Sequence, residues 1–301
     1  MSDDSSFPQQ ARVELQFEMD LQPPAQPSPA SKRNLSIAIV PVLLVVITFL
    51  FWRETWFGRR LTDREMSQYL TDTSVPHKTQ HALAQLAERI ARGDASARQW
   101  YPQVLALAAH RESEFRLMAA WVMGQDNKSE EFHVALAKLV VDPDPMVRRN
   151  TALALVRFGD ASGRAELRAM LEPFPLRGPQ AGTIAFRLRD GDPVRSGTVV
   201  ARIQSGESKP VDVVSPVAGE LARRAGADQA NVAAGDVVAE IAPGEDQAWE
   251  ALRALYLVGT QEDLEDVERL ARSAPGISDR VRQQAALTAE AIRRRARGGS
   301  P

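Results

Sequence analysis

Apolar side chains recur at helical spacing across residues 142–160, which form the clearest single element of the chain. The sequence there is DPDPMVRRNTALALVRFGD, and it places Val147, Leu155 and Phe158 on one face of a helix. The DPDP turn that comes first offers an aspartate as N-cap and a proline for the first helical turn. The glycine near the end of the stretch suits a helix C-terminus. The pattern predicts one turn followed by one amphipathic helix.

The same helix recurs at three other places. Residues 115–124 repeat its first part 32 residues upstream, residues 251–259 repeat its middle and end, and residues 281–286 repeat it near the C-terminus. These copies resemble the HEAT-repeat family in its short form of about 30 residues, as in the HEAT-like repeats of phycobilisome lyases. The resemblance implies an α-solenoid, in which stacked helix pairs bury their apolar stripes on their neighbours. It also implies a surface for a partner protein, which the sequence does not identify.

Helical periodicity extends on both sides of these copies. The predicted solenoid occupies residues 61–172 and continues at residues 245–297. Further helices are predicted at residues 62–70, 79–92, 97–110, 161–171, 246–260, 262–273 and 278–297. Arginine recurs at one repeat position, as Arg116, Arg148 and Arg282. The resemblance implies that this arginine ties neighbouring turns together through acidic partners.

Residues 173–244 have a different character, since valine, glycine and proline increase and the pattern becomes that of short strands and turns. Residues 181–203 align with residues 218–241, because both stretches begin Ala-Gly and end V-V-A-x-I. Two such halves resemble the biotinyl/lipoyl-like barrel-sandwich hybrid, and residues 211–221 are similar to the strand–turn–strand that follows the modified lysine in that family. This β domain is expected as an insertion between the two helices of one repeat, where repeat proteins tolerate insertions.

The N-terminal residues carry a different prediction. Residues 1–34 are polar and proline-rich, so a disordered tail is expected. Residues 35–52 contain no charge and would span about 27 Å as a helix, which predicts a single transmembrane helix. The chain is therefore expected in a bacterial inner membrane with one pass. More Lys and Arg follow the span than precede it, which favours a cytoplasmic bulk, and a periplasmic bulk stays open. The fold class is then multidomain α plus β.

Composition narrows the possible chemistry. A formal net charge of −2 over 301 residues provides no basic field, so no nucleic-acid partner is expected. The absence of cysteine excludes disulfides, thiolate metal sites and cysteine nucleophiles. No nucleophile, base and acid form a recognisable set. We therefore expect a protein that is not an enzyme and has no cofactor.

Lys209 is the residue that a biotin or lipoate carrier would use. Its context is GESKP, whereas the carrier families have A-M-K-M or D-K-A around the lysine. Counted back from Ser215, Lys209 is one residue closer than the lipoyl pattern places it, and Pro210 reshapes the tip. A solvated turn lysine is expected, with cofactor binding at Lys209 as the alternative.

A second pair of residues, His77 and His81, has the spacing of a zinc-protease helix. Lys78 stands where those enzymes have glutamate, and the sequence positions no third ligand. Surface histidines and no metal are therefore expected.

The leading hypothesis is a membrane-anchored scaffold or adaptor that binds a protein through its HEAT-like solenoid, without catalysis. One alternative is a component of an export system related to membrane-fusion proteins, which pair an anchor with a biotinyl/lipoyl-like hybrid. The other is an enzyme subunit that carries biotin or lipoate on Lys209.

Overall fold

The computed structural model describes residues 59–272 and 276–298. The chain divides into two units after Arg60, and every helix and strand of the described residues lies in the second unit. Two 3₁₀ helices, Ala95–Trp100 and Gln261–Asp263, join ten α-helices in the described residues. The α-helices are α2 (Asp63–Thr71), α3 (Pro76–Ala91), α4 (Tyr101–Ala108), α5 (Ser113–Met123), α6 (Glu130–Leu139), α7 (Pro145–Arg157), α8 (Arg164–Ala169), α9 (Glu245–Val258), α10 (Leu264–Ala271) and α11 (Asp279–Ala296).

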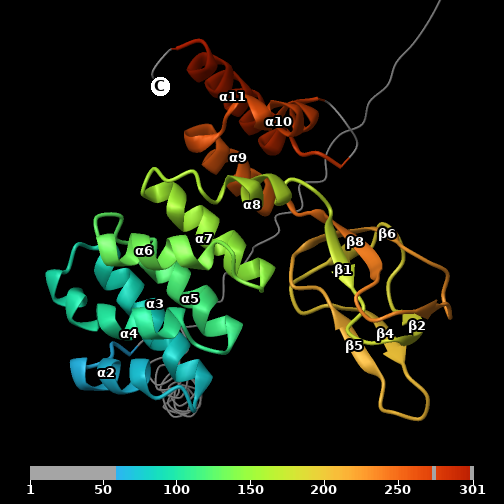
Figure 1. The fold of residues 1–301 in the computed structure, drawn as a ribbon, viewed down its shortest axis with the longest axis horizontal. Coiled ribbons are helices and arrows are strands. Elements are labelled where there is room, and N and C mark those ends of the chain that lie inside the picture. The colour runs from blue at the N-terminus through green and yellow to red at the C-terminus, as the bar shows by residue number, and fades with distance from the viewer. Residues whose placement is uncertain (1–58, 273–275, 299–301) are drawn as a thin grey trace, which may run out of the picture. The chain divides into compact units, whose positions relative to one another are not determined.

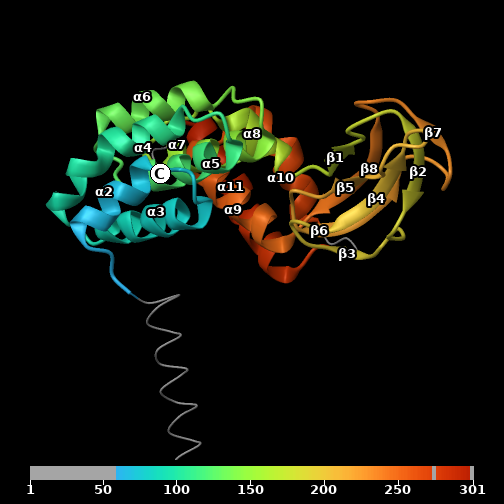
Figure 2. The same cartoon turned by 90° about the horizontal axis from the view of Figure 1, so that it is seen from below.

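The helices stack in consecutive pairs (Figures 1 and 2). The pairs are α2 with α3, α4 with α5, α6 with α7, α8 with α9, and α10 with α11. The second helices of the pairs, α3, α5, α7, α9 and α11, also contact one another in that order. Each second helix therefore has a neighbour from the preceding pair and from the following pair, wherever such a pair exists.

Helix α7 shows why the sequence forms these elements. The Asp144 side chain caps the helix by accepting a hydrogen bond from the Met146 N–H at 2.8 Å, and Pro145 occupies the first turn. Val147 and Leu155 are fully buried against the neighbouring helices. Gly159 ends the segment with φ of +74°, a conformation that glycine adopts without strain. The helix predicted within residues 142–160 thus begins and ends where its capping residues lie.

Eight short strands lie in the sequence between α8 and α9, and we call them the β module. They are β1 (Phe174–Arg177), β2 (Gly182–Phe186), β3 (Pro193–Val194), β4 (Val199–Gln204), β5 (Val211–Val214), β6 (Gly219–Arg224), β7 (Asn231–Val232) and β8 (Val237–Pro243). They form two four-stranded antiparallel sheets with the orders β1-β8-β6-β3 and β5-β4-β2-β7. Buried aliphatic side chains from both sheets, such as Ile184, Val200 and Ile241, form one core between them.

The two sheets have the same internal arrangement. Strands four places apart in the sequence are equivalent: β1 corresponds to β5, β8 to β4, β6 to β2 and β3 to β7. With these equivalences, the order β1-β8-β6-β3 becomes β5-β4-β2-β7. The register agrees, since Leu176 pairs with Ala239 in one sheet and Val213 pairs with Ala201 in the other. The turns agree as well: the Gly191 N–H donates to Leu221 O, and the Gln229 N–H donates to Ile184 O, both at 2.8 Å. The β module is therefore built from two halves related by an approximate twofold.

The β module joins the helices through adjacent strands, because β1 pairs with β8. We call the start of β1 and the end of β8 the root of the module. There, the guanidinium carbon of Arg149 from α7 lies 4.8 Å from the centre of the Phe174 ring. Arg149 is only 4% exposed, and its Nη1 donates to Gln247 Oε1 of α9 at 3.1 Å. The Gln247 Nε2 donates in turn to Met170 O at 2.9 Å. One buried arginine thus connects α7, α9 and the first strand of the module.

The predicted fold class and localisation need correction. No helix within residues 59–272 and 276–298 is long and apolar enough to cross a membrane. The prediction of a single-pass inner-membrane protein rested on length and lack of charge at residues 35–52, and both that segment and the tail at residues 1–34 lie outside the described residues. The described fold is a set of α-helices with two antiparallel sheets.

Candidate functional site

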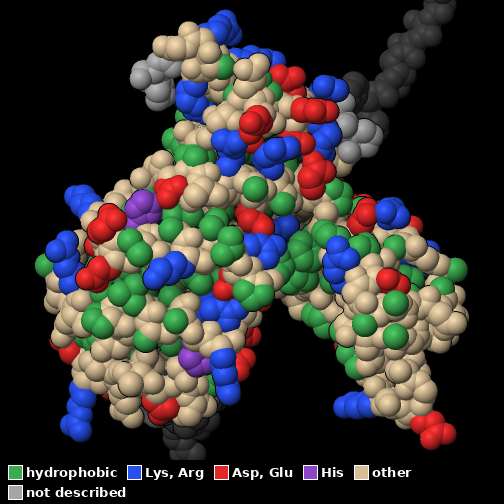
Figure 3. Space-filling view, viewed as in Figure 1, with side chains coloured by type: hydrophobic (Ala, Val, Ile, Leu, Met, Phe, Trp, Pro, Cys, Tyr) green, Lys and Arg blue, Asp and Glu red, His purple; other side chains and the backbone are tan. Residues whose placement is uncertain are grey.

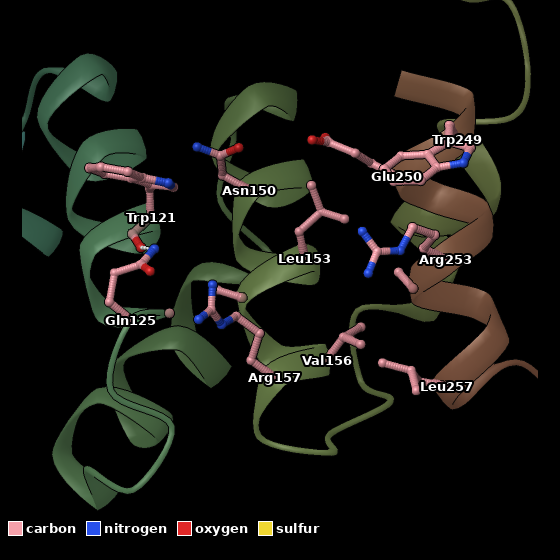
Figure 4. Close-up of a pocket in the computed structure, with 13 residues that line it drawn as sticks. Trp121, Gln125, Asn150, Leu153, Val156, Arg157, Trp249, Glu250, Arg253 and Leu257 are labelled. Carbon is pink, nitrogen blue, oxygen red and sulfur yellow. Dashed lines mark hydrogen bonds between the residues drawn. The ribbon is translucent and has the colours of Figure 1, made fainter. Parts of the chain in front are cut away.

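Three consecutive second helices, α5, α7 and α9, present side chains from the same repeat positions to one hollow (Figure 4). When the repeats are aligned on their shared pattern, Trp121, Leu153 and Arg253 are equivalent. The residues at these positions project from neighbouring helices because the helices lie side by side in the stack. The hollow follows from the repeat arrangement and is not an irregularity of one loop.

The hollow has a volume of about 430 Å³, and we call it the inner groove. Its floor is apolar and its sides carry aromatic, amide and charged groups. Its lining residues are Trp121, Gly124, Gln125, Asn150, Leu153, Ala154, Val156, Arg157, Trp249, Glu250, Arg253, Ala254 and Leu257.

Apolar side chains in the inner groove are exposed to solvent. Trp121 is 42% exposed and Leu257 is 60% exposed, although each lies in a helix whose other face is buried in the core. Trp249 is held between two cations: the guanidinium carbons of Arg253 and Arg280 lie 4.7 Å and 4.1 Å from its ring centre. Such contacts fix the orientation of an indole through the attraction between a cation and its π-face. The groove therefore combines two tryptophans with an exposed leucine.

Two arginines in the inner groove have no acidic partner. Arg157 and Arg253 are exposed, and neither has a carboxylate oxygen within 4 Å among the described residues. Glu250 is the one acidic residue among those that line the groove. In Figure 4, Glu250 points toward Asn150, and Arg157 lies on the other side of Leu153. Arg253 lies on the same side of Leu153 as Glu250, so the two arginines flank Leu153, and both lie below Glu250 in this view.

Unlike Arg157 and Arg253, the arginines at the recurring repeat position form ion pairs with acidic side chains. Arg116 donates from Nε and Nη2 to the two oxygens of Asp142, at 2.7 Å and 2.8 Å. Arg148 pairs with Glu166 and donates to Asp142 O at 2.8 Å. Arg282 pairs with Asp279 of its own helix. Arg116 and Arg148 thus tie turns and helices together, whereas Arg282 is paired within its own helix, and all three guanidinium groups have an acidic partner.

Asp142 shows how firmly this pairing is built. Burial raises the pKa of its carboxyl, but the hydrogen bonds from Arg116 and from the Asp144 N–H outweigh burial, so the pKa lies below its usual value. A side chain that is 4% exposed and accepts these bonds has a structural role.

A second group of charges covers α8 and α10. Arg164 pairs with Glu262 at 2.5 Å and Arg168 pairs with Asp266 at 2.9 Å, while Asp263 is buried beside both arginines. Figure 3 shows acidic and basic side chains interleaved over the α8–α11 region. These charges neutralise one another. The ion pairs therefore serve to hold α8 against α10, the first helices of two successive pairs.

The residues singled out from the sequence lie apart from the inner groove. Lys209 is exposed in the hairpin loop between β4 and β5, where Gln204 Nε2 donates to Gly206 O and Ser208 O at 2.6 Å. Figure 1 shows this hairpin at the end of the module opposite its root. His77 is exposed, and the His81 ring lies 2.9 Å from Gln85 Nε2. Within residues 59–272 and 276–298, no group of three or more His, Asp or Glu side chains is placed to hold a metal ion.

The sequence alone does not identify the inner groove. Trp121 and Trp249 are at helical spacing, which predicts core or groove packing without distinguishing the two. One sequence feature does point to the groove. Trp121 and Leu153 are 32 residues apart, and Arg253 occupies the same position of its repeat.

Comparison with known proteins bears on one stretch of the chain. No curated protein matches the chain. Residues 101–177, which include α4 to α8, match the family of HEAT repeats, and this confirms the HEAT-repeat part of the resemblance for that stretch.

Proposed function

We propose that this protein is a non-catalytic scaffold that binds a partner protein in the inner groove. The observation that carries the proposal is the exposure of Trp121 and Leu257 beside Arg157 and Arg253 in one hollow. Tryptophan and arginine are the residues most enriched among those that dominate protein interfaces. HEAT repeats are typical of protein-interaction scaffolds, so the family match agrees with this use of the stack.

The β module is proposed as a biotinyl/lipoyl-like hybrid that braces the stack or adds a second contact surface. Its two equivalent four-stranded sheets support the resemblance. The buried contact of Arg149 with Phe174 supports the bracing role, because it joins the module to α7 through a desolvated side chain.

Cofactor attachment at Lys209 is the second candidate. It is supported by the twofold arrangement of the module and by the exposed hairpin that carries the lysine. The unfavourable sequence context, with Pro210 directly after the lysine, makes it the weaker of the two. The export-system alternative depended on a membrane anchor and is not proposed.

A site-specific photocrosslink tests the leading proposal. A photoreactive amino acid replaces Leu257 in the inner groove, and in a matched protein it replaces Val141, which is 79% exposed and lies outside the groove. After irradiation in the native cell, we expect a defined crosslinked protein from position 257 that position 141 does not give. The crosslink should also be lost when Trp121→Ala is introduced. Equal crosslinking at both positions, or none at position 257, contradicts the proposal.

A further inference from the structure

We propose that the inner groove recognises a partner segment in which carboxylates stand next to large apolar side chains. This inference rests on the proposed function and adds the chemistry of the partner to it. Its basis is the placement, in one hollow, of exposed apolar surface beside two guanidinium groups that pair with no carboxylate of the described residues.

The charges of the groove indicate the acidic part of the partner. Many arginines elsewhere in the helices have carboxylate partners, as Arg116 does with Asp142 and Arg168 does with Asp266. Arg157 and Arg253 are left without one among the described residues, and they come from adjacent helices of the stack. The guanidinium group presents a planar set of donors that matches a carboxylate in two hydrogen bonds. Two such groups, one on each side of Leu153, suit a segment that brings one or two acidic residues.

The apolar surface indicates the rest of the segment. Leu153 of α7 lies between Trp121 of α5 and Leu257 of α9. A volume of about 430 Å³ falls within the range of roughly 300–1,000 Å³ of sites that enclose small ligands. Such a hollow accommodates a few side chains of a short segment, and an aromatic or leucine side chain would cover the exposed indole of Trp121.

Glu250 sets a limit on the charge of the segment. It lies above both arginines in the view of Figure 4, so a run of acidic residues along the whole groove would bring carboxylates against it. Like charges at close range oppose binding. The favoured segment is therefore acidic at one end and apolar or neutral at the other.

A random peptide library tests this composition without knowledge of the natural partner. A phage-displayed library of 12-residue peptides is selected on the purified full chain, and the enriched peptides are then measured individually by fluorescence anisotropy. We expect enrichment of Asp or Glu next to Leu, Phe or Trp, and at least tenfold weaker binding to Trp121→Ala. Selection on the double variant Arg157→Glu, Arg253→Glu should enrich Lys or Arg in place of the acids.

Matched controls separate this inference from the proposed function. The double variant Arg187→Glu, Arg189→Glu makes the same charge change at exposed residues of the β module, and it should keep the acidic preference. Thermal unfolding verifies that each variant folds, and Leu257→Ala replaces Trp121→Ala if that variant does not.

Each result has a definite reading. This inference is overturned if binding of the peptides depends on Trp121 but the peptides show no enrichment of Asp or Glu. It is also overturned if that enrichment persists on the Arg157→Glu, Arg253→Glu variant. In both cases the groove remains a docking site. Peptides that bind all groove variants equally, or no enrichment, overturn the proposed function as well. Binding of a single-stranded oligonucleotide that Trp121→Ala abolishes, without peptide binding, replaces the peptide ligand with a nucleic acid.

Discussion

Gly182 and Gly219 occupy equivalent positions in the two halves of the β module, and each lies directly against a main-chain carbonyl. A Cβ at Gly182 would lie 2.2 Å from Gln204 O, and a Cβ at Gly219 would lie 1.9 Å from Ala242 O. The two carbonyls belong to β4 and β8, which are themselves equivalent strands. The shared Ala-Gly at the start of each half therefore has a steric cause, because only glycine permits this approach.

Alanine at either glycine is expected to destabilise the β module by about 1–3 kcal/mol, because the strand must shift away from the carbonyl. Native-state hydrogen exchange of amides in β4 and β8 measures this loss within the module. Gly226→Ala is the matched control, since a Cβ there meets no atom within 4 Å and its effect should stay within about 0.5 kcal/mol. Equal effects at all three positions would show that the close approach does not constrain the fold.

Removal of the buried carboxylate at Asp142 should destabilise the helix stack strongly. Asp142→Asn leaves the half-buried Arg116 without its charged partner, and loss of one member of a buried pair costs about 3 kcal/mol or more. Urea unfolding at pH 7, followed by tryptophan fluorescence, measures the change. Asp212→Asn breaks an exposed pair with Arg202 and should change stability by less than about 1 kcal/mol.

The same carboxylate should make stability dependent on pH in the acidic range. The pKa of Asp142 is lowered in the folded state, so its contribution is present above the unfolded value of about 4 and is lost as pH falls through the folded value. The stability difference between the natural protein and Asp142→Asn should therefore shrink below about pH 4 and stay constant from pH 5 to pH 7. A difference that grows on acidification would contradict this assignment.

Arg149 and Phe174 should be energetically coupled across the root of the β module. A double-mutant cycle with Arg149→Met and Phe174→Leu is expected to give a coupling of about 1–2 kcal/mol, since the contact is desolvated. The contact of Arg224 with Phe186, at 5.5 Å and more exposed, serves as the comparison and should give a smaller value. Additive effects of the two root substitutions would mean that the module is not braced through this arginine.

Lys209 is expected to be unmodified. Intact mass spectrometry of the protein, purified from cells that contain biotin and lipoate ligases, should give the mass of the bare chain. A mass increase equal to biotin or lipoate that Lys209→Arg abolishes would establish the carrier alternative instead.

The repeats made part of this fold predictable from the sequence. Residues 142–160 predict a helix because their caps and apolar positions agree, and α7 spans Pro145–Arg157. Residues 97–110 predict one helix, whereas the structure has a 3₁₀ helix up to Trp100 and then α4. The break comes directly before Pro102, which has no N–H to continue the hydrogen bonding of the preceding turn.

Other features depend on contacts that a linear pattern does not contain. The aligned halves at residues 181–203 and 218–241 omit β1 and β5, which are also equivalent, because FPLRGP and VDVVSP share little beyond their final proline. Trp121 is exposed at a hollow that α7 and α9 also line, and no local pattern encodes how these helices pack. The same is true of Arg149, whose burial follows from the position of Phe174, 25 residues later in the chain.

The pairing of β1 with β8 brings the two connections of the β module next to each other, while α8 and α9 contact one another directly. The helix pair of this repeat therefore packs together on its own side of the two connections. The same position could hold any domain whose own termini lie close together. Replacement of the β module by such a domain would leave the contact between α8 and α9 in place.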